Sequence, residues 1–181
     1  MTKLAEIHVE NALSPRFGRG WHCLGEADEF RDGKLHTLNI FGTRLLAFST
    51  ASGAISVLDA HCPHMGADLS QGTIENDRIV CPFHHWQYDA SGKCVEIPYC
   101  KRIPPKAKTR AWQTCEVNKL LFVWNNPEGK PPAEDVVIPH LPEMDSDEWL
   151  HSWHMDKLII NTQPRELVDN LVDAQHFGPV H

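Results

Sequence analysis

The chain has 181 residues, of which 41% are hydrophobic, enough to fill the core of one full domain and part of a second. Its 17 basic and 24 acidic side chains give a net charge of −7, which argues against nucleic acid as a partner, because nucleic-acid binding needs a basic surface. No apolar run approaches about eighteen residues, so we expect no membrane span, and the N-terminus lacks the apolar core of a secretory signal.

The first part of the chain is predicted to be a mainly β domain. Residues 1–17 are expected to form an N-terminal arm and residues 18–126 the domain itself. Residues 35–41 alternate apolar and polar side chains, and a glycine-containing turn separates 43–50 from 55–59, as in a hairpin. The remaining strands are expected at 78–81, 85–89, 93–97, 116–117 and 120–124. Many short strands separated by Gly and Pro are typical of an all-β architecture.

Two short loops between these strands each offer one thiolate and one imidazole. Cys62 and His64 have the spacing C-x-H, and Cys81 and His84 have the spacing C-x2-H. Two Cys and two His could hold a structural zinc ion, or the pairs could be chance in a chain with 12 histidines. The third alternative is a Rieske [2Fe–2S] cluster, in which two thiolates hold one iron and two imidazoles the other. A zinc finger usually groups its cysteines and its histidines separately, so the mixed loops favour the cluster.

The segments LDAHCPHMGADLSQG and CPFHHWQYDASGKC resemble the cluster-binding half of the Rieske non-haem iron oxygenases. The resemblance implies a Rieske β-sandwich domain and a [2Fe–2S] cluster on the four residues above, with His85 outside the set of ligands. Respiratory Rieske proteins have similar loops, but they carry a disulfide at the positions of Ala67 and Phe83 and a serine at that of Trp86, while Tyr88 is kept. Fewer hydrogen bonds to the cluster sulfurs imply a low reduction potential.

A basic run follows the second loop. It consists of Lys101, Arg102, Lys106, Lys108 and Arg110, in an otherwise acidic protein. The simpler interpretation is a solvated loop, and the alternative is a docking patch that steers an acidic electron donor toward the cluster.

The next segment is predicted to link two domains. Five of the 13 prolines fall within residues 127–142, which we therefore expect to be an extended linker. Residues 149–160 resemble a strand, and residues 143–181 are expected to begin an α+β catalytic domain of the helix-grip type. A helix should follow, capped by Asn161 or Thr162, and the pair Gly178-Pro179 should break it.

The last residues of the chain have the pattern N-x2-D-x2-H-x4-H, formed by Asn170, Asp173, His176 and His181. It resembles the mononuclear iron signature of the same oxygenases. The resemblance implies that His176 and His181 bind Fe(II), and that Asp173 links this iron to a Rieske histidine of a neighbouring subunit. The carboxylate ligand of that family lies further downstream. We therefore expect a fragment of a longer protein or a broken reading frame, and no activity from the 181 residues alone.

Among subfamilies, the sequence most resembles the oxygenase components of 3-ketosteroid 9α-hydroxylases, on RGWHCLG, IPYCKRIPPKAKTRAW and LLFVWNNPEG. The resemblance implies a monooxygenase of steroid degradation that uses O2 and takes electrons from NAD(P)H through a ferredoxin-type or flavin reductase. It also implies a small hydrophobic substrate and a homotrimer. The alternatives are another hydrophobic ring substrate, or a Rieske ferredoxin-like electron carrier without catalytic activity. Six cysteines without a disulfide-like pattern favour the reducing cytoplasm.

Overall fold

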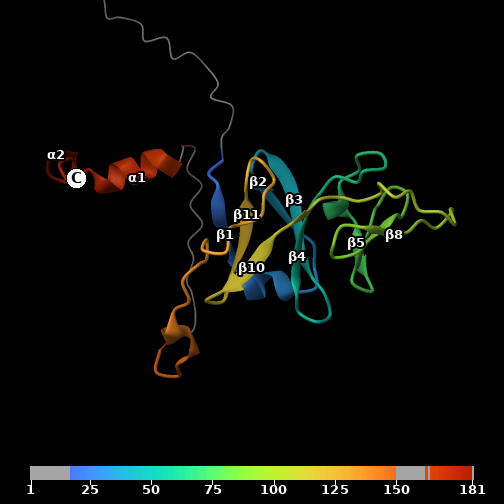
Figure 1. Ribbon diagram of the computed structural model, residues 1–181, viewed down its shortest axis with the longest axis horizontal. Helices are drawn as coiled ribbons and strands as arrows, with labels where there is room; N and C mark the ends of the chain where they lie inside the picture. Colours follow the sequence, from blue (N-terminus) through green and yellow to red (C-terminus); the bar gives the residue numbers. More distant parts are fainter. Residues whose placement is uncertain (1–16, 150–161, 163, 181) are drawn as a thin grey trace, which may run out of the picture. The chain divides into compact units, whose positions relative to one another are not determined.

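The computed structural model describes residues 17–149, 162 and 164–180, and the chain divides into two compact units, 1–151 and 152–181. The first unit contains three antiparallel sheets within the described residues (Figure 1). One sheet has the order β1-β11-β10. Its strands are β1 (Gly20–Glu26), β10 (Thr114–Val117) and β11 (Leu120–Asn125).

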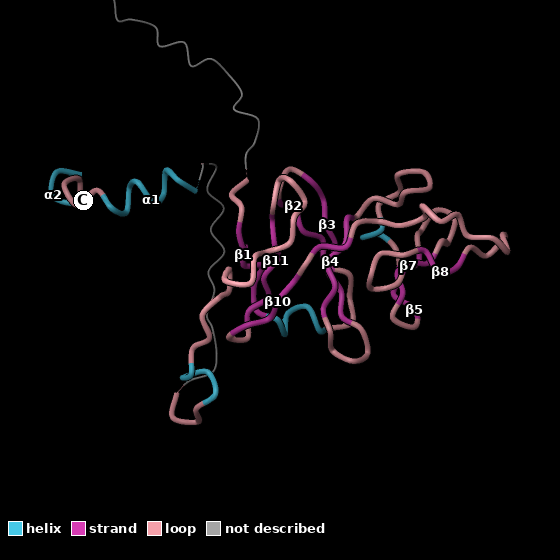
Figure 2. The backbone as a smooth tube through the Cα atoms, viewed as in Figure 1, coloured by secondary structure: helices cyan, strands magenta, loops and turns pink. Residues whose placement is uncertain are grey.

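A four-stranded sheet with the order β2-β3-β4-β9 occupies the middle of this unit. Its strands are β2 (His36–Ile40), β3 (Thr43–Ser49), β4 (Ile55–Asp59) and β9 (Ala111–Trp112). The third sheet has the order β5-β6-β7-β8 and lies at the end of the unit away from β1. Its strands are β5 (Thr73–Glu75), β6 (Arg78–Val80), β7 (Gln87–Tyr88) and β8 (Cys94–Glu96). Loops form most of this end (Figure 2).

Strand β3 is buried on both faces and divides the interior into two cores. Leu45 and Ala47 point into a core shared with β1, β11 and the 3-10 helix Ala27–Arg31. Leu46 and Phe48 point into a second core, which includes the third sheet and both cysteines of the predicted cluster. Because successive side chains of a strand point to opposite faces, one strand supports the sandwich and the cluster end together.

The prediction of a mainly β fold is confirmed, with differences at several strands. Ile55–Asp59 has the predicted bounds, whereas Gln87–Tyr88 is shorter than the predicted 85–89. Strand β1 was not predicted because a β-bulge between Cys23 and Gly25 interrupts its alternation, and its partner β11 lies about one hundred residues away in sequence. Strands β5 and β9 were also not predicted, since each has only two or three residues.

The proline-rich segment is extended and is held by side chains of the first sheet. The indole N–H of Trp21 donates to the carbonyl of Val136 (2.9 Å), and that of Trp124 donates to the carbonyl of Lys130 (2.8 Å). Asn118 accepts a hydrogen bond from the N–H of Leu141 (2.8 Å). A 3-10 helix, Pro142–Asp145, follows. The domain bounds 18–126, 127–142 and 143–181 stay a prediction, and the predicted strand at 149–160 lies almost wholly outside the described residues.

The second unit contains two helices, α1 (Pro164–Val172) and α2 (Phe177–Val180). The predicted helix exists, but the predicted break at Gly178-Pro179 is wrong, because α1 ends before Asp173 and both residues lie within α2. The side chain of Asp173 accepts a hydrogen bond from the N–H of Gln175, which stabilises a turn in place of another helical turn. Proline is tolerated early in α2, where its missing N–H has no helical partner. Within the described part of the chain, no helix is long and apolar enough to span a membrane.

Candidate metal centre

The first of the two predicted ligand loops follows β4 and is closed by two backbone hydrogen bonds. The N–H of Cys62 donates to the carbonyl of Ala67 (2.8 Å), and the N–H of Gly66 donates back to the carbonyl of Cys62 (2.8 Å). Gly66 has a φ of 73°, a left-handed conformation that glycine adopts at little cost. This turn places His64 between Cys62 and the bend.

The second loop lies between β6 and β7 and repeats the same turn. The N–H of Cys81 donates to the carbonyl of Trp86 (2.9 Å), and the N–H of His85 donates to the carbonyl of Cys81 (3.0 Å). His85 occupies the position equivalent to Gly66 and has a φ of 57°. The two loops therefore have corresponding hydrogen bonds, and they differ in that His84 stands one residue further along its turn than His64 does.

The two loops bring the cysteine side chains together in the interior. Cys62 and Cys81 are 3% and 1% exposed, and their thiols are close enough to interact. Burial raises the pKa of Cys81, so its thiol keeps its proton until a metal displaces it. The hydroxyl of Tyr88 lies 3.1 Å from the sulfur of Cys62. Burial, followed by the contact with Cys62, raises the pKa of Tyr88 strongly, so this hydroxyl remains a donor.

The imidazoles lie together on the outer side of the cysteines. The ring centroids of His64 and His84 are 4.7 Å apart, and both side chains are half-buried. Nδ1 of His64 is buried and has no hydrogen-bond partner among the described residues. A buried ring nitrogen without a protein partner, beside a second imidazole and two adjacent thiols, is the donor set that a Rieske cluster requires. The residues present therefore fit the group.

The arrangement has thiols on one side and imidazoles on the other, which suits two metal ions held in pairs. A structural zinc of the Cys2His2 type needs all four ligands around a single ion. The geometry thus favours the cluster over the zinc alternative.

A row of aromatic rings continues from the imidazoles to the surface. The ring of His64 stacks on Trp86, with centroids 4.3 Å apart and an interplanar angle of 8°. The indole N–H of Trp86 donates to the hydroxyl of Tyr99 (2.7 Å), and Tyr99 is 64% exposed. At the other end, the ring of Phe83 lies 3.9 Å from that of His84. Sequence reasoning did not find Tyr99, because no local pattern links it to a residue thirteen positions earlier.

The residues predicted for a mononuclear iron lie in the second unit. Asp173 and His176 are brought together in the turn after α1, where Nδ1 of His176 lies 2.5 Å from the backbone carbonyl oxygen of Asp173 and 3.9 Å from its carboxylate. The Asp173 side chain is 56% exposed and that of His176 15% exposed. Asn170 lies on α1 and is exposed, and His181 lies outside the described residues.

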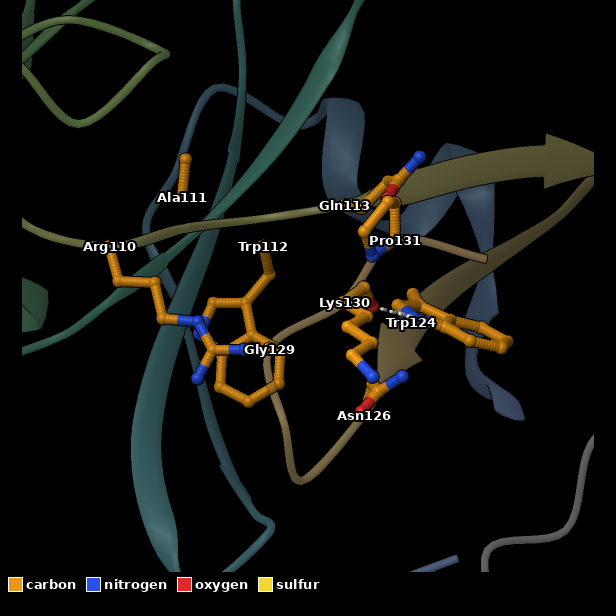
Figure 3. Close-up of a pocket in the computed structure, with 9 residues that line it drawn as sticks. All are labelled: Arg110, Ala111, Trp112, Gln113, Trp124, Asn126, Gly129, Lys130 and Pro131. Carbon is orange, nitrogen blue, oxygen red and sulfur yellow. Dashed lines mark hydrogen bonds between the residues drawn. The ribbon is translucent and has the colours of Figure 1, made fainter. Parts of the chain in front are cut away.

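A separate pocket of about 180 Å³ contains none of the predicted ligands (Figure 3). The guanidinium of Arg110 lies over the indole of Trp112, 3.7 Å from the ring centroid. The N–H of this indole donates a hydrogen bond to the carboxylate of Asp59 (2.7 Å). Lys130 lines the same pocket, and its carbonyl accepts the indole N–H of Trp124. Arg110 is thus packed against an aromatic ring, unlike the rest of the basic run.

Two protein-family models match the chain. A Rieske [2Fe-2S] domain matches residues 20–119, and a 3-ketosteroid 9alpha-hydroxylase C-terminal domain matches residues 123–181. The first match covers both cysteine loops, and the second covers both helices of the second unit.

Several relatives are similar over nearly the whole chain. A 3-ketosteroid-9-alpha-monooxygenase oxygenase component of Rhodococcus rhodochrous is 50% identical over 175 residues, which are 96% of this chain and 45% of the relative. One of the same name from Mycobacterium tuberculosis is 44% identical, over 94% of this chain and 44% of the relative. Cholesterol 7-desaturase nvd 1 of Ciona intestinalis is 37% identical, over 96% of this chain and 36% of the relative. The chain spans less than half the length of these relatives.

Solved structures with a similar fold include a monooxygenase and a protein bound to caffeine. Dicamba monooxygenase bound to dicamba matches with a TM-score of 0.63 and 25% identity, covering 71% of this chain and 38% of the other. Pseudomonas putida NdmA with caffeine matches with a TM-score of 0.55 and 26% identity, covering 61% of this chain and 34% of the other.

Proposed function

Because the chain belongs to the Rieske [2Fe-2S] domain family, we propose that it serves as the oxygenase component of a steroid-hydroxylating system, with electrons supplied by a reductase or ferredoxin. The observation that supports this most is the pair of matching loops, which hold Cys62 and Cys81 inside and His64 and His84 toward the surface. A buried thiol side and an accessible imidazole side suit electron transfer, because electrons can enter and leave without opening the core.

The roles of the residues follow from their positions. Cys62 and Cys81 would hold one iron and His64 and His84 the other, while Tyr88 donates a hydrogen bond to the sulfur of Cys62. When bound, the cluster supplies single electrons, and a mononuclear iron activates O2 for insertion into a C–H bond.

The steroid substrate and the mononuclear iron rest on similarity. The similar proteins are 3-ketosteroid monooxygenases and a cholesterol desaturase, and the compounds in these names share the steroid ring system. His176 and His181 would bind Fe(II), and Asp173 would connect this iron with a Rieske histidine of a neighbouring subunit. The turn after α1 holds Asp173 and His176 close together, as this proposal requires. A homotrimer in the cytoplasm completes the proposal.

The cluster is tested by reconstitution of the chain with iron and sulfide under anaerobic conditions. We expect two irons and two acid-labile sulfides per chain and a Rieske-type EPR signal with low average g. Cys81→Ser should abolish the signal, whereas His85→Ala, one residue beyond a ligand, should retain it. Stoichiometric zinc without sulfide would contradict the cluster assignment.

The activity is tested on the full-length gene product with a reductase, NADH, O2 and a 3-ketosteroid. We expect a product that is heavier by one oxygen atom, and Asp173→Ala should lose the product while it keeps the Rieske EPR signal. A product lighter by two hydrogen atoms would indicate a desaturase instead. A cluster that is reduced and reoxidised without any change in the steroid would favour the electron-carrier alternative.

A further inference from the structure

We propose that an acidic electron-donor protein docks on the surface formed by Tyr99, Lys101 and Arg102, and that Tyr99 and Trp86 provide its electron with a route to the histidine side of the cluster. The inference rests on the proposed function, because it takes the Rieske cluster as the electron acceptor. It adds the site of entry and the chemistry of the partner surface.

The route is the aromatic row that begins at a ligand and ends at the surface. His64 stacks almost parallel on Trp86, and the Trp86 indole N–H is directed to the hydroxyl of Tyr99 at 2.7 Å. Trp86 is 8% exposed and Tyr99 is 64% exposed, so the row leads from the interior to solvent within two side chains. A partner that covers Tyr99 is therefore connected to His64 by only two side chains, Tyr99 and Trp86, which are joined by this hydrogen bond.

The charges beside Tyr99 select the partner. Lys101 and Arg102 are exposed, and neither forms an ion pair with the part of the chain that the structure describes. Arg110, at the end of the same basic run, lies instead over Trp112 (Figure 3). The chain carries a net charge of −7, so its overall charge repels an acidic partner, whereas Lys101 and Arg102 attract one locally. Such a local field steers association and fixes orientation.

The opposite end of the aromatic row lacks this feature. Phe83 is 59% exposed and contacts His84, but its sequence neighbours between Pro82 and Gln87 include no lysine or arginine. An apolar centre with a charged rim is typical of a transient protein interface, and the Tyr99 end combines the two, since Lys101 and Arg102 follow it in sequence. The step itself is the transfer of one electron: the reduced donor is oxidised, the cluster is reduced, and no bond or proton is exchanged.

Docking is measured without electron transfer, so that binding is separated from chemistry. The probe is an acidic plant-type ferredoxin whose iron is replaced by gallium, titrated into the cluster-loaded chain in a calorimeter at low and high salt. We expect a Kd that weakens with salt, and a weakening of at least tenfold in Lys101→Glu/Arg102→Glu. Lys34→Glu/Lys130→Glu, the matched control with the same charge change outside the basic run, should change Kd less than twofold.

The route is measured by stopped-flow reduction of the cluster with the native, reduced ferredoxin at saturating concentration. Tyr99→Leu removes the exposed ring, and we expect the rate to fall at least fivefold. Reduction by dithionite, which needs no docking surface, and the midpoint potential should be unchanged. Tyr99→Phe keeps the ring without the hydroxyl, and its rate of reduction should lie between those of the unmodified protein and Tyr99→Leu.

The outcomes separate this inference from the proposed function. Equal loss of binding in both charge-reversed variants, or binding that salt does not weaken, would overturn the docking surface. An unchanged rate in Tyr99→Leu would overturn the route. Failure of the loaded chain to show a Rieske signal with dithionite would instead overturn the proposed function.

Discussion

The Tyr88 hydroxyl contacts Cys62, a proposed cluster ligand, and its effect is best examined through the reduction potential. The oxygen lies 3.1 Å from the sulfur of Cys62, and the tyrosine is fully buried. A hydrogen bond to sulfur is stronger when the cluster carries the extra electron, so it raises the potential.

We predict that Tyr88→Phe lowers the midpoint potential. If the hydrogen bond differs by about 1 kcal/mol between the two oxidation states, the shift is about 40 mV. The indole N–H of Trp86 is directed to Tyr99, not to a sulfur, so the unmodified protein should lie in the lower half of the range of roughly −150 to +300 mV. Protein-film voltammetry measures both values, and a potential unchanged in Tyr88→Phe would show that this bond has no effect on redox.

His85 holds a backbone conformation that costs free energy in any residue with a Cβ. Its φ of 57° is left-handed, like the φ of 73° at Gly66, which occupies the equivalent position in the first loop. We predict that His85→Gly raises the free energy of unfolding by about 0.5–1 kcal/mol and leaves the EPR signal unchanged. Thermal unfolding of the loaded protein tests this. His85→Val, which adds a branched Cβ, should lower the unfolding temperature.

Asp32 has a pKa of about 2 in the folded protein, well below its usual value. The main cause is the hydrogen bond from His36 at 2.8 Å, and the N–H of Lys34 also contributes. Since folding lowers this pKa, the stabilisation is present above the ordinary value of 3.8 and is lost as the pH falls toward about 2. In an NMR titration of the side-chain carboxyl, His36→Ala should return the pKa toward 3.8. A value that stays near 2 would assign the shift to another group.

At the scale of elements, Gly72 sets the distance between the two loops. It follows the 3-10 helix Leu69–Gln71, and a Cβ built on it would overlap the carbonyl oxygen of Val80 at the end of β6. Cys81 is the next residue, so this contact places the second ligand loop against the first.

We predict that Gly72→Ala lowers the free energy of unfolding by about 2–3 kcal/mol, because backbone atoms, rather than a flexible side chain, would have to move. It should also reduce the iron content after reconstitution. The control is Gly18→Ala, since the space around Gly18 is open. Equal iron content in both variants would mean that the spacing of the loops tolerates the change.

The elements that were predictable are those set by neighbours in sequence. The β3–β4 hairpin and the four proposed ligands follow from alternation, turn residues and spacing within a few positions. Strand β1 pairs with β11 across almost the whole first unit, and no local signal reveals that register. The end of α1 depends on one side chain, Asp173, which competes with the helix for a backbone N–H. The sequence alone does not show whether a side chain or the helix will take that N–H, so the end of the helix could not be predicted.

At the scale of the whole molecule, the two cores differ in their dependence on the cluster. The core that contains Leu46 and Tyr88 also contains Cys62 and Cys81, whereas the core around Leu45 includes no predicted ligand. We predict that removal of iron loosens one core and spares the other. Hydrogen exchange of the apoprotein should be faster in β5–β8 and in both ligand loops, and unchanged in β1 and β11. Uniformly faster exchange would show that the cluster stabilises the entire unit.

The corresponding turns around Cys62 and Cys81 have a consequence for redesign. Since each turn is closed by the same two backbone hydrogen bonds, the identity and position of the second ligand are not fixed by the backbone. The two six-residue segments 62–67 and 81–86 should therefore be exchangeable for one another. A chain with residues 62–67 copied into both loops would have the same C-x-H spacing in each loop. Such a variant would show whether the unequal native spacings, C-x-H and C-x2-H, are required for assembly of the cluster or only for its contact with other proteins.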